Sequence, residues 1–190
     1  DLAEIFPYIN PQMLFVRHLG YRGRFSEAMD AGEAKAVDLW NKVRQVENIM
    51  LERDDIQANA IYKFFRAGAD ADDLLVISPD GKDDLQRLRF GRQSAAAALC
   101  LADYVQPRSS ATPDYVGGFV TSIGPGVRAL ADQWTPDGDF LSSHILQALA
   151  LESAEAFAEL LHQRMRAMWT FADAPGMSYV DLFRAQYRGK

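Results

Sequence analysis

Glu155, Glu159 and His162 are the residues whose types and spacing first point to chemistry. Their three-and-four spacing puts them on one face of a helix, and Glu159-Leu-Leu-His162 matches the E-x-x-H element of di-iron helical bundles. Such a centre needs a second E-x-x-H, and neither His18 nor His144 has a glutamate three residues before it. We therefore predict no metal site and interpret the three side chains as part of a solvated, charged helix edge.

The glycine-rich stretches do not form a phosphate-binding motif. Gly117-Gly118 lies inside an expected strand, and Gly124-Pro-Gly126 lacks the third glycine of the dinucleotide fingerprint. No G-x-S-x-G elbow accompanies the three histidines, so no nucleophile can be paired with a base. The apolar neighbours of Cys100 are typical of a small buried hydrophobe rather than a nucleophile. We therefore predict no catalytic residue.

Composition restricts the class of protein. The chain has 190 residues, enough for one sizeable core or two small subdomains, and 48% of them are apolar, which argues against disorder. A net charge of -6 without a Lys/Arg cluster argues against a nucleic-acid partner. A single cysteine excludes an internal disulfide framework and suits a reducing, cytoplasmic location. No apolar run reaches the roughly 18 residues of a membrane span, so we expect no membrane partner.

The dominant predicted element is a long helix over residues 139–171, which contain neither Gly nor Pro. Apolar residues recur at helical spacing along one side, which we expect to be buried: Leu146, Ala150, Phe157, Leu161 and Met168, with Ile145, Leu149, Ala156 and Leu160. Polar residues follow the same spacing on the opposite side: Glu152, Glu155, Glu159, Gln163 and Arg166. Either Asp137 or Asp139 is expected to cap the N-terminus.

The remaining pattern predicts an α+β fold with an antiparallel sheet of short strands packed with helices. Asn10 followed by Pro11 predicts a helix start, with Gly20 as its end. A second helix is expected over 26–50, broken or begun near Gly32. Strands are expected around 58–65, 74–77, 85–90 and 114–123. Further helices are expected over the alanine-rich 94–104, over 127–134, and from Ser178 to residue 187.

Three stretches, in this order and spacing, resemble one family, the C-terminal activation domain of cobalamin-dependent methionine synthase, which binds S-adenosylmethionine (AdoMet). They are Cys100-Leu-Ala-Asp-Tyr-Val105 with Asp114-Tyr-Val-Gly-Gly-Phe-Val120; Ala129-Leu-Ala-Asp132; and Ala148-Leu-Ala150 with Ala154-Glu-Ala-Phe-Ala-Glu159, Leu161-His162 and Arg164. Tyr8-Ile9-Asn10 and residues 182–189 also fall where the family has similar segments. The resemblance therefore covers essentially the whole chain.

The resemblance implies a role in repairing the cobalamin of a methyltransferase. In the family, the enzyme moves a methyl group from 5-methyltetrahydrofolate to homocysteine in methionine biosynthesis, and its cobalamin occasionally oxidises to inactive cob(II)alamin. The activation domain then docks on the cobalamin-binding domain of the same chain and presents AdoMet, while flavodoxin or an equivalent flavoprotein supplies an electron. Methylcobalamin is thereby restored. Zinc belongs only to the homocysteine domain of such an enzyme.

Two residues are carried over as site candidates. The family holds the amino-acid end of AdoMet partly through an acidic residue after Tyr-Ile, a position that is Asn10 here, so Asn10 is an AdoMet-binding candidate alongside its capping interpretation. Glu155 resembles a helix carboxylate near the interface with ligand and corrin. The family's Arg before Gly-Tyr-Pro is expected just beyond Lys190. We therefore expect residues 1–190 to be an AdoMet-binding activation domain truncated at its C-terminal side, a fragment of a larger multidomain enzyme and inactive alone.

Two other functions fit the same residues. The chain could be a separate AdoMet-binding protein that reactivates a corrinoid partner, which a gene without homocysteine, folate and cobalamin modules would favour. It could also be a non-catalytic docking module that uses its acidic edge, which a failure to bind AdoMet would favour.

Overall fold

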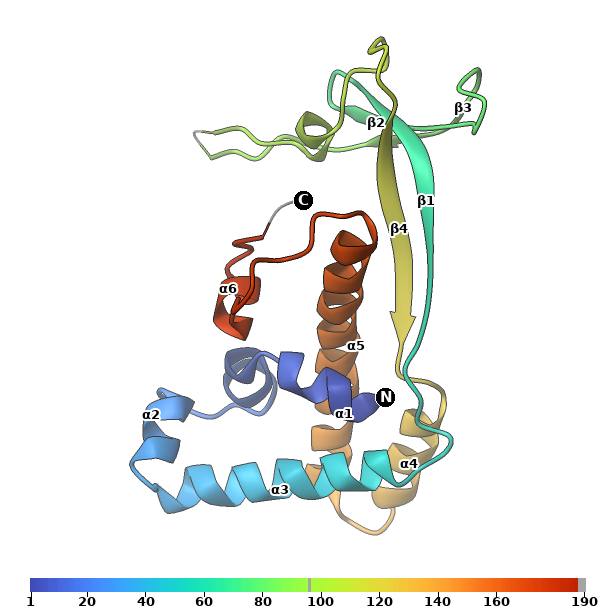
Figure 1. Cartoon of the computed structure of the whole chain (residues 1–190). Coiled ribbons are helices and arrows are strands. Elements are labelled where there is room, and N and C mark those ends of the chain that lie inside the picture. Colours follow the sequence, from blue (N-terminus) through green and yellow to red (C-terminus); the bar gives the residue numbers. More distant parts are fainter. Residues whose placement is uncertain (96, 188–190) are drawn as a thin grey trace. The chain divides into compact units, whose positions relative to one another are not determined.

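The computed structural model describes residues 1–95 and 97–187 (Figure 1). The chain folds as two compact units: Asp1–Ala60 with Thr121–Tyr187, and Ile61–Val120. The helical elements are α1 (Leu2–Ile5), η1 (Phe6–Tyr8), η2 (Gln12–His18), α2 (Phe25–Asp30), α3 (Ala34–Leu51), η3 (Leu101–Tyr104), α4 (Gly126–Trp134), α5 (Phe140–Met168) and α6 (Tyr179–Phe183). The strands are β1 (Asn59–Asp70), β2 (Asp73–Ile77), β3 (Asp84–Arg89) and β4 (Asp114–Ser122). Helices with an antiparallel sheet confirm the predicted α+β class.

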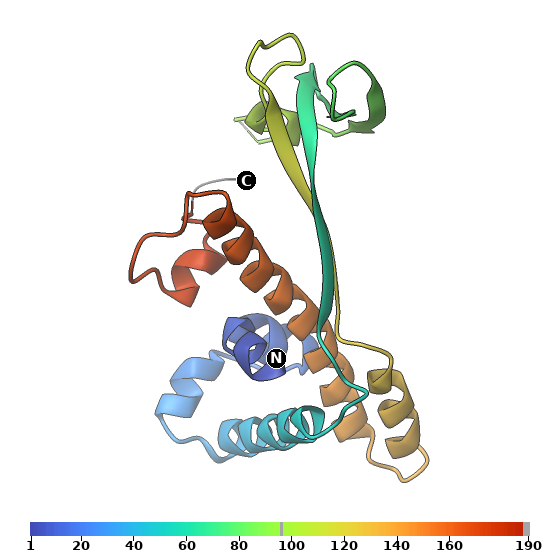
Figure 2. The same ribbon diagram turned by 45° about the vertical axis from the view of Figure 1, so that its right-hand side comes forward.

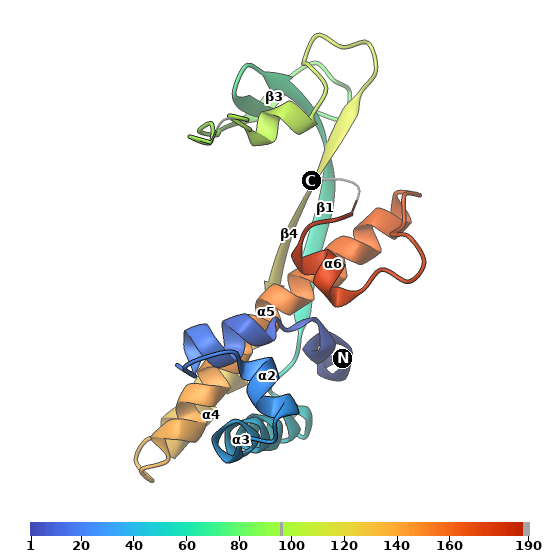
Figure 3. The same cartoon turned by 90° about the vertical axis from the view of Figure 1, so that its left-hand side faces the viewer.

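The first unit is built around α5. Helices α1, α3 and α4 and the short helical elements η1 and η2 all contact it (Figures 1 and 3). The helix begins where Asp139 accepts a hydrogen bond from the Ser142 amide at 3.1 Å, so Asp139 rather than Asp137 is the N-cap. Its most deeply buried apolar side chains are Ile145, Leu146 and Leu149, which confirms the predicted core face.

The polar side of α5 differs from the prediction. Glu152 and Arg166 were expected on a solvated edge, but they are 5% and 1% exposed. Both are buried because a short segment from elsewhere in the chain covers each of them and brings an ionisable partner, His18 for Glu152 and Asp173 for Arg166. Met168, the last residue of the helix, was expected in the core but is 50% exposed.

The N-terminal helices begin and end where the sequence predicted, but one of them has a different helical geometry. Asn10 and Pro11 start η2, and Gly20, with φ +68°, follows its end. The segment is a π-helix, in which the Leu19 amide donates to the Leu14 carbonyl five residues earlier at 3.0 Å. The predicted helix over 26–50 is broken at Gly32, with φ +67°, into α2 and α3.

The second unit carries a four-stranded sheet in the order β3-β2-β1-β4, and Figure 2 shows β4 alongside β1. The predicted loop between the first two strands is shorter than expected. β1 continues to Asp70, which pairs with Asp73, because Gly68 and Ala69 form ladder pairs with β2. Only residues 71 and 72 remain as the turn, and Ala71 adopts φ +53° there.

The helix predicted over the alanine-rich residues 94–104 was wrong over the part that the structure describes; residue 96 lies outside it. Only η3 is helical, and Ala98 sits in a tight turn with φ +44°. Arg92 stabilises this turn by donating to the Ala98 carbonyl and to the Asp103 carboxylate. Cys100 is buried, as predicted, and its thiol contacts the Asp72 carbonyl at 3.5 Å. These tertiary contacts outweigh the helix propensity of alanine.

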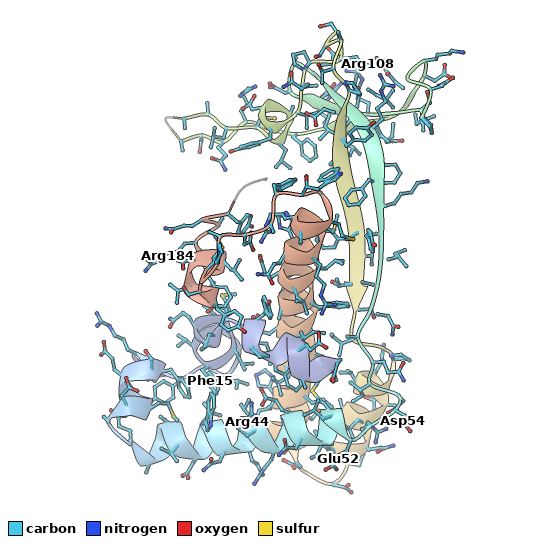
Figure 4. The ribbon with its side chains drawn as sticks, in the orientation of Figure 1. Phe15, Arg44, Glu52, Asp54, Arg108 and Arg184 are labelled. Atoms are coloured by element: carbon cyan, nitrogen blue, oxygen red, sulfur yellow. The ribbon has the colours of Figure 1, made fainter. Side chains whose placement is uncertain are left out.

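The last predicted helix is shorter than expected. Ser178 caps α6 through a reciprocal pair of contacts with Asp181, as predicted, but the helix ends at Phe183 instead of continuing to residue 187. Ala185, with φ +50°, interrupts the helical backbone. Arg184, labelled in Figure 4, lies at the C-cap of this helix. The family-like segment 182–189 extends past Tyr187, so its end lies outside the described residues.

Candidate functional site

A pocket of about 420 Å³ in the first unit brings both sequence-predicted site residues together. It is enclosed by η1, η2 and the connection between them on one side, and by the middle of α5 and the end of α6 on the others. The residues that line it are Tyr8, Asn10, Met13, His18, Leu151, Glu152, Glu155, Ala156, Glu159 and Phe183. Asn10 and Glu155, distant in sequence, thus share one cavity. None of these lining residues is Lys or Arg.

The helix wall of the pocket carries three carboxylates. Glu152, Glu155 and Glu159 are three and four residues apart, so α5 presents all of them toward the same side. Glu155 is exposed and Glu159 is half-buried. Burial raises the pKa of the Glu159 carboxyl; Arg166 opposes this shift, whereas the negative charges of Glu155 and Asp173 add to it. The wall therefore brings three carboxyl groups together, and burial disfavours the charged form of one of them, Glu159.

Only one of these carboxylates has a basic partner that lines the pocket. His18 Nε2 lies 2.7 Å from Glu152 Oε1, and the Glu152 side chain is only 6% exposed. The His18 backbone carbonyl in turn lies 2.9 Å from His144 Nε2, which ties the end of η2 to the first part of α5. Glu155 and Glu159 have no cationic side chain beside them among the lining residues.

The N-terminal wall is held in place by two hydrogen bonds. Tyr8 Oη donates to Gln163 Oε1 on α5 at 2.6 Å, which fixes the residue two positions before Asn10. The Asn10 side-chain Oδ1 accepts a hydrogen bond from the Gln12 amide at 3.0 Å. Asn10 thus binds the first residue of η2 through its side chain, although Pro11 rather than Asn10 holds the N-cap position.

A buried ion pair anchors the segment that leads to α6. Arg166 Nε and Nη2 donate to the two oxygens of Asp173 at 2.7 and 2.6 Å, and the Arg166 guanidinium lies 4.0 Å from the centre of the Tyr187 ring. Gln163 Nε2 also donates to Asp173, at 3.2 Å. Hydrogen bonds from Arg166 hold the pKa of Asp173 below its ordinary value. Tyr8, Gln163, Asp173 and Arg166 thus form one chain of contacts behind the pocket.

The E-x-x-H element divides between two environments. Glu159 lines the pocket, whereas His162 lies against the edge of the Tyr187 ring, with 5.2 Å between ring centres. Burial lowers the pKa of His162. Within residues 1–95 and 97–187, no group of three or more His, Cys, Asp or Glu side chains is placed to hold a metal ion.

Sequence reasoning missed several lining residues. His18 and Met13 come from a segment with no recognisable motif, and Phe183 comes from the short last helix. Glu152 was assigned to the solvated edge, although its spacing from Glu155 and Glu159 already placed it on the same face. Nothing in the pattern showed that His18 would cover it, because that contact spans 134 residues.

The first unit has other cavities with different linings. One, of about 340 Å³, is mainly apolar; Phe15 and Arg44, both labelled in Figure 4, line it. Another, of about 680 Å³, lies along α4 and α5 beside the turn at Gly124. Asp55 packs so closely beneath this turn that a Cβ on Gly126 would lie 2.6 Å from its carbonyl oxygen. Of these cavities, only the acidic pocket holds the two predicted site residues, Asn10 and Glu155.

Among the described helices, none has the length and apolar character that a membrane span requires.

Fold and site together define an α+β module with a pocket on its central helix that is lined by three carboxylates. The family described as "Vitamin B12 dependent methionine synthase, activation domain" matches residues 1–190, and the chain belongs to this family. A solved structure described as the "MetH Reactivation Domain bound to AdoHcy" is 25% identical in sequence, with a TM-score of 0.87. That match covers 100% of this chain and 61% of the solved one, so this chain spans less than two thirds of its relative's length.

Proposed function

We propose that this chain binds AdoMet in the acidic pocket and presents it as methyl donor for the reductive remethylation of cobalamin. The observation that carries the proposal is the shared pocket of Asn10 and Glu155, whose walls hold three carboxylates and, besides His18, no basic side chain. AdoMet carries a sulfonium and an ammonium group, and such charges favour a negative pocket. The related solved domain holds S-adenosylhomocysteine (AdoHcy), which AdoMet becomes after it loses its methyl group.

The two walls of the pocket would contact different groups of the ligand. The Glu155 carboxylate is exposed to the cavity and can accept a charge-assisted hydrogen bond from the ammonium group. Because Asn10 Oδ1 already accepts the Gln12 amide, its NH2 group is the better placed donor for the ligand carboxylate. Asn10 thus has a different role from that of an acidic residue at this position. Phe183 and Met13 supply apolar surface for the rest of the molecule.

The chemistry of the methyl transfer belongs to AdoMet and to cobalamin, which we propose is held by another domain of the same protein. Cobalamin supplies the centre that takes up one electron and the methyl group, and AdoMet leaves as the neutral thioether AdoHcy. The residues of this chain bind and orient the sulfonium compound and keep its carboxylate end fixed. We propose flavodoxin or an equivalent flavoprotein as electron donor, and a parent enzyme that methylates homocysteine with 5-methyltetrahydrofolate.

Titration calorimetry of AdoMet tests this proposal. We expect binding by the natural full-length protein, and a loss of affinity of about tenfold or more on Glu155→Gln, because a charged acceptor is replaced by a neutral one. Glu27→Gln is the matched control, since Glu27 lies on α2, outside the pocket, in an exposed pair with Arg24. Equal affinities of wild type and Glu155→Gln would contradict the placement of the ligand. Absence of binding in the wild type would refute the proposed function.

A further inference from the structure

One solvent-inaccessible carboxylate oxygen beside the acidic pocket has no hydrogen-bond partner among residues 1–95 and 97–187. Glu159 lines the pocket, and its Oε2 is inaccessible to solvent yet unpaired among residues 1–95 and 97–187. Glu152 is different, since it pairs with His18, and Glu155 is different because it is open to solvent. A carboxylate with one buried oxygen that lacks a donor is costly to keep charged, so the half-buried Glu159 gains from a nearby cation.

Arg166 is the basic group that acts on Glu159 and favours its charged form, but most of its guanidinium is engaged elsewhere. On its own helix, Glu155 is also negative, and the nearby Arg166 directs two nitrogens at Asp173 and stacks on the Tyr187 ring. His162, half-buried on the next turn, has a pKa lowered by burial. The groups that face the pocket from other elements are neutral or already paired: Tyr8, Asn10 and His18. A positive charge brought by a ligand would therefore share Glu159 with Arg166, whose Nη1 makes no hydrogen bond to a described residue.

The proposed methyl transfer changes the charge of the ligand at its sulfur. AdoMet has a sulfonium centre, and the transfer breaks its S–CH3 bond, leaves the electron pair of that bond on sulfur, and produces the neutral thioether of AdoHcy. The two molecules have the same adenosine and amino-acid ends. A residue that makes the pocket bind one of these ligands more tightly than the other must therefore interact with the charge on sulfur.

Resting on the proposed function, we infer that Glu159 is a specificity-determining residue that makes the pocket prefer the sulfonium of AdoMet over the thioether of AdoHcy. Its carboxylate stabilises the methyl donor and loses that interaction when the methyl group leaves. The product is then held less tightly than the donor, which favours exchange after each transfer. The amino-acid end, bound in the same way in both ligands, does not contribute to this preference.

The test compares AdoMet and AdoHcy affinities in the natural full-length protein by titration calorimetry. Wild type should bind AdoMet about tenfold more tightly than AdoHcy, the order expected for one partly screened charge pair. Glu159→Gln keeps the shape of the side chain and should bring the two dissociation constants to within about twofold of each other, chiefly by weakening AdoMet. Glu159→Asp keeps the charge and should retain part of the preference. Glu27→Gln, which removes an exposed charge elsewhere, should leave the ratio unchanged.

The outcomes separate this inference from the proposed function. If wild type binds both ligands and Glu159→Gln leaves their ratio unchanged, or weakens both equally, the inference is overturned while the proposed function stands. A ratio that falls equally in Glu27→Gln would also overturn it, because net charge rather than Glu159 would then set the preference. If wild type binds neither ligand, the proposed function fails and this inference fails with it.

Discussion

The buried Arg166–Asp173 pair should be the most stability-critical polar contact behind the pocket. Both side chains are almost fully covered, at 1% and 7% exposure, and two short hydrogen bonds join them. Arg166→Met removes both bonds and leaves the Asp173 carboxylate buried with only Gln163 as donor. Loss of one partner of a buried pair costs about 3–5 kcal/mol, so we expect the free energy of unfolding to fall by that amount.

The same helix provides a matched control. Arg164 lies two residues earlier and pairs with Glu4 at 2.6 Å, but these side chains are 54% and 57% exposed. Arg164→Met should therefore cost less than about 1 kcal/mol, because water replaces an exposed ion pair. A double variant, Arg166→Met with Asp173→Leu, removes the stranded charge and should recover about 2 kcal/mol or more of the loss.

Urea denaturation followed by tryptophan fluorescence suits this comparison, since Trp40, Trp134 and Trp169 all belong to the first unit and report its unfolding alone. The reasoning would be refuted if Arg166→Met cost no more than Arg164→Met. It would also be refuted if the double variant were as unstable as the single one, because burial of an unpaired carboxylate would then not be the cause.

Two further results are expected from the same contacts. Tyr8→Phe removes the hydrogen bond to Gln163 and should weaken AdoMet binding about threefold to tenfold, the worth of one hydrogen bond; Tyr179→Phe, which keeps its edge contact with the Tyr8 ring, should bind normally in the same calorimetric assay. Because the folded pKa of Asp173 lies below its ordinary value of 3.8, the stabilisation is complete above that pH and is lost as the pH falls through the folded pKa. In acid denaturation, Arg166→Met should lack this contribution. If the variant lost stability with falling pH as the wild type does, the assignment of this contribution to the Arg166–Asp173 pair would be wrong.

Much of the helical unit could be predicted from local pattern alone. The apolar period over residues 139–171, the cap at Asp139 and the breaks at Gly20 and Gly32 each depend on a few neighbouring residues, and each is seen in the structure. The alanine-rich segment after Arg92 failed because its conformation depends on a side chain that reaches across the turn, a contact that propensity cannot anticipate.

The site was predictable only in part, for the same reason. Spacing placed Glu155 and Glu159 on one helix face, and the family resemblance added Asn10, which the structure brings to the same pocket. The burial of Glu152 and Arg166 could not be read from the helix pattern. Each is covered by a residue of another segment, and only the folded chain shows which segment that is.

The central claim, that this chain presents AdoMet for methyl transfer to cobalamin, is tested most directly by following the methyl group. The natural full-length protein would be given AdoMet labelled in its methyl group, together with a low-potential electron donor, and the label on its cobalamin would be measured. We predict that label reaches the cobalamin in the wild type and that transfer at subsaturating AdoMet falls in Glu155→Gln but not in Glu27→Gln. Wild-type protein that binds AdoMet but transfers no label, with electrons supplied, would contradict the account.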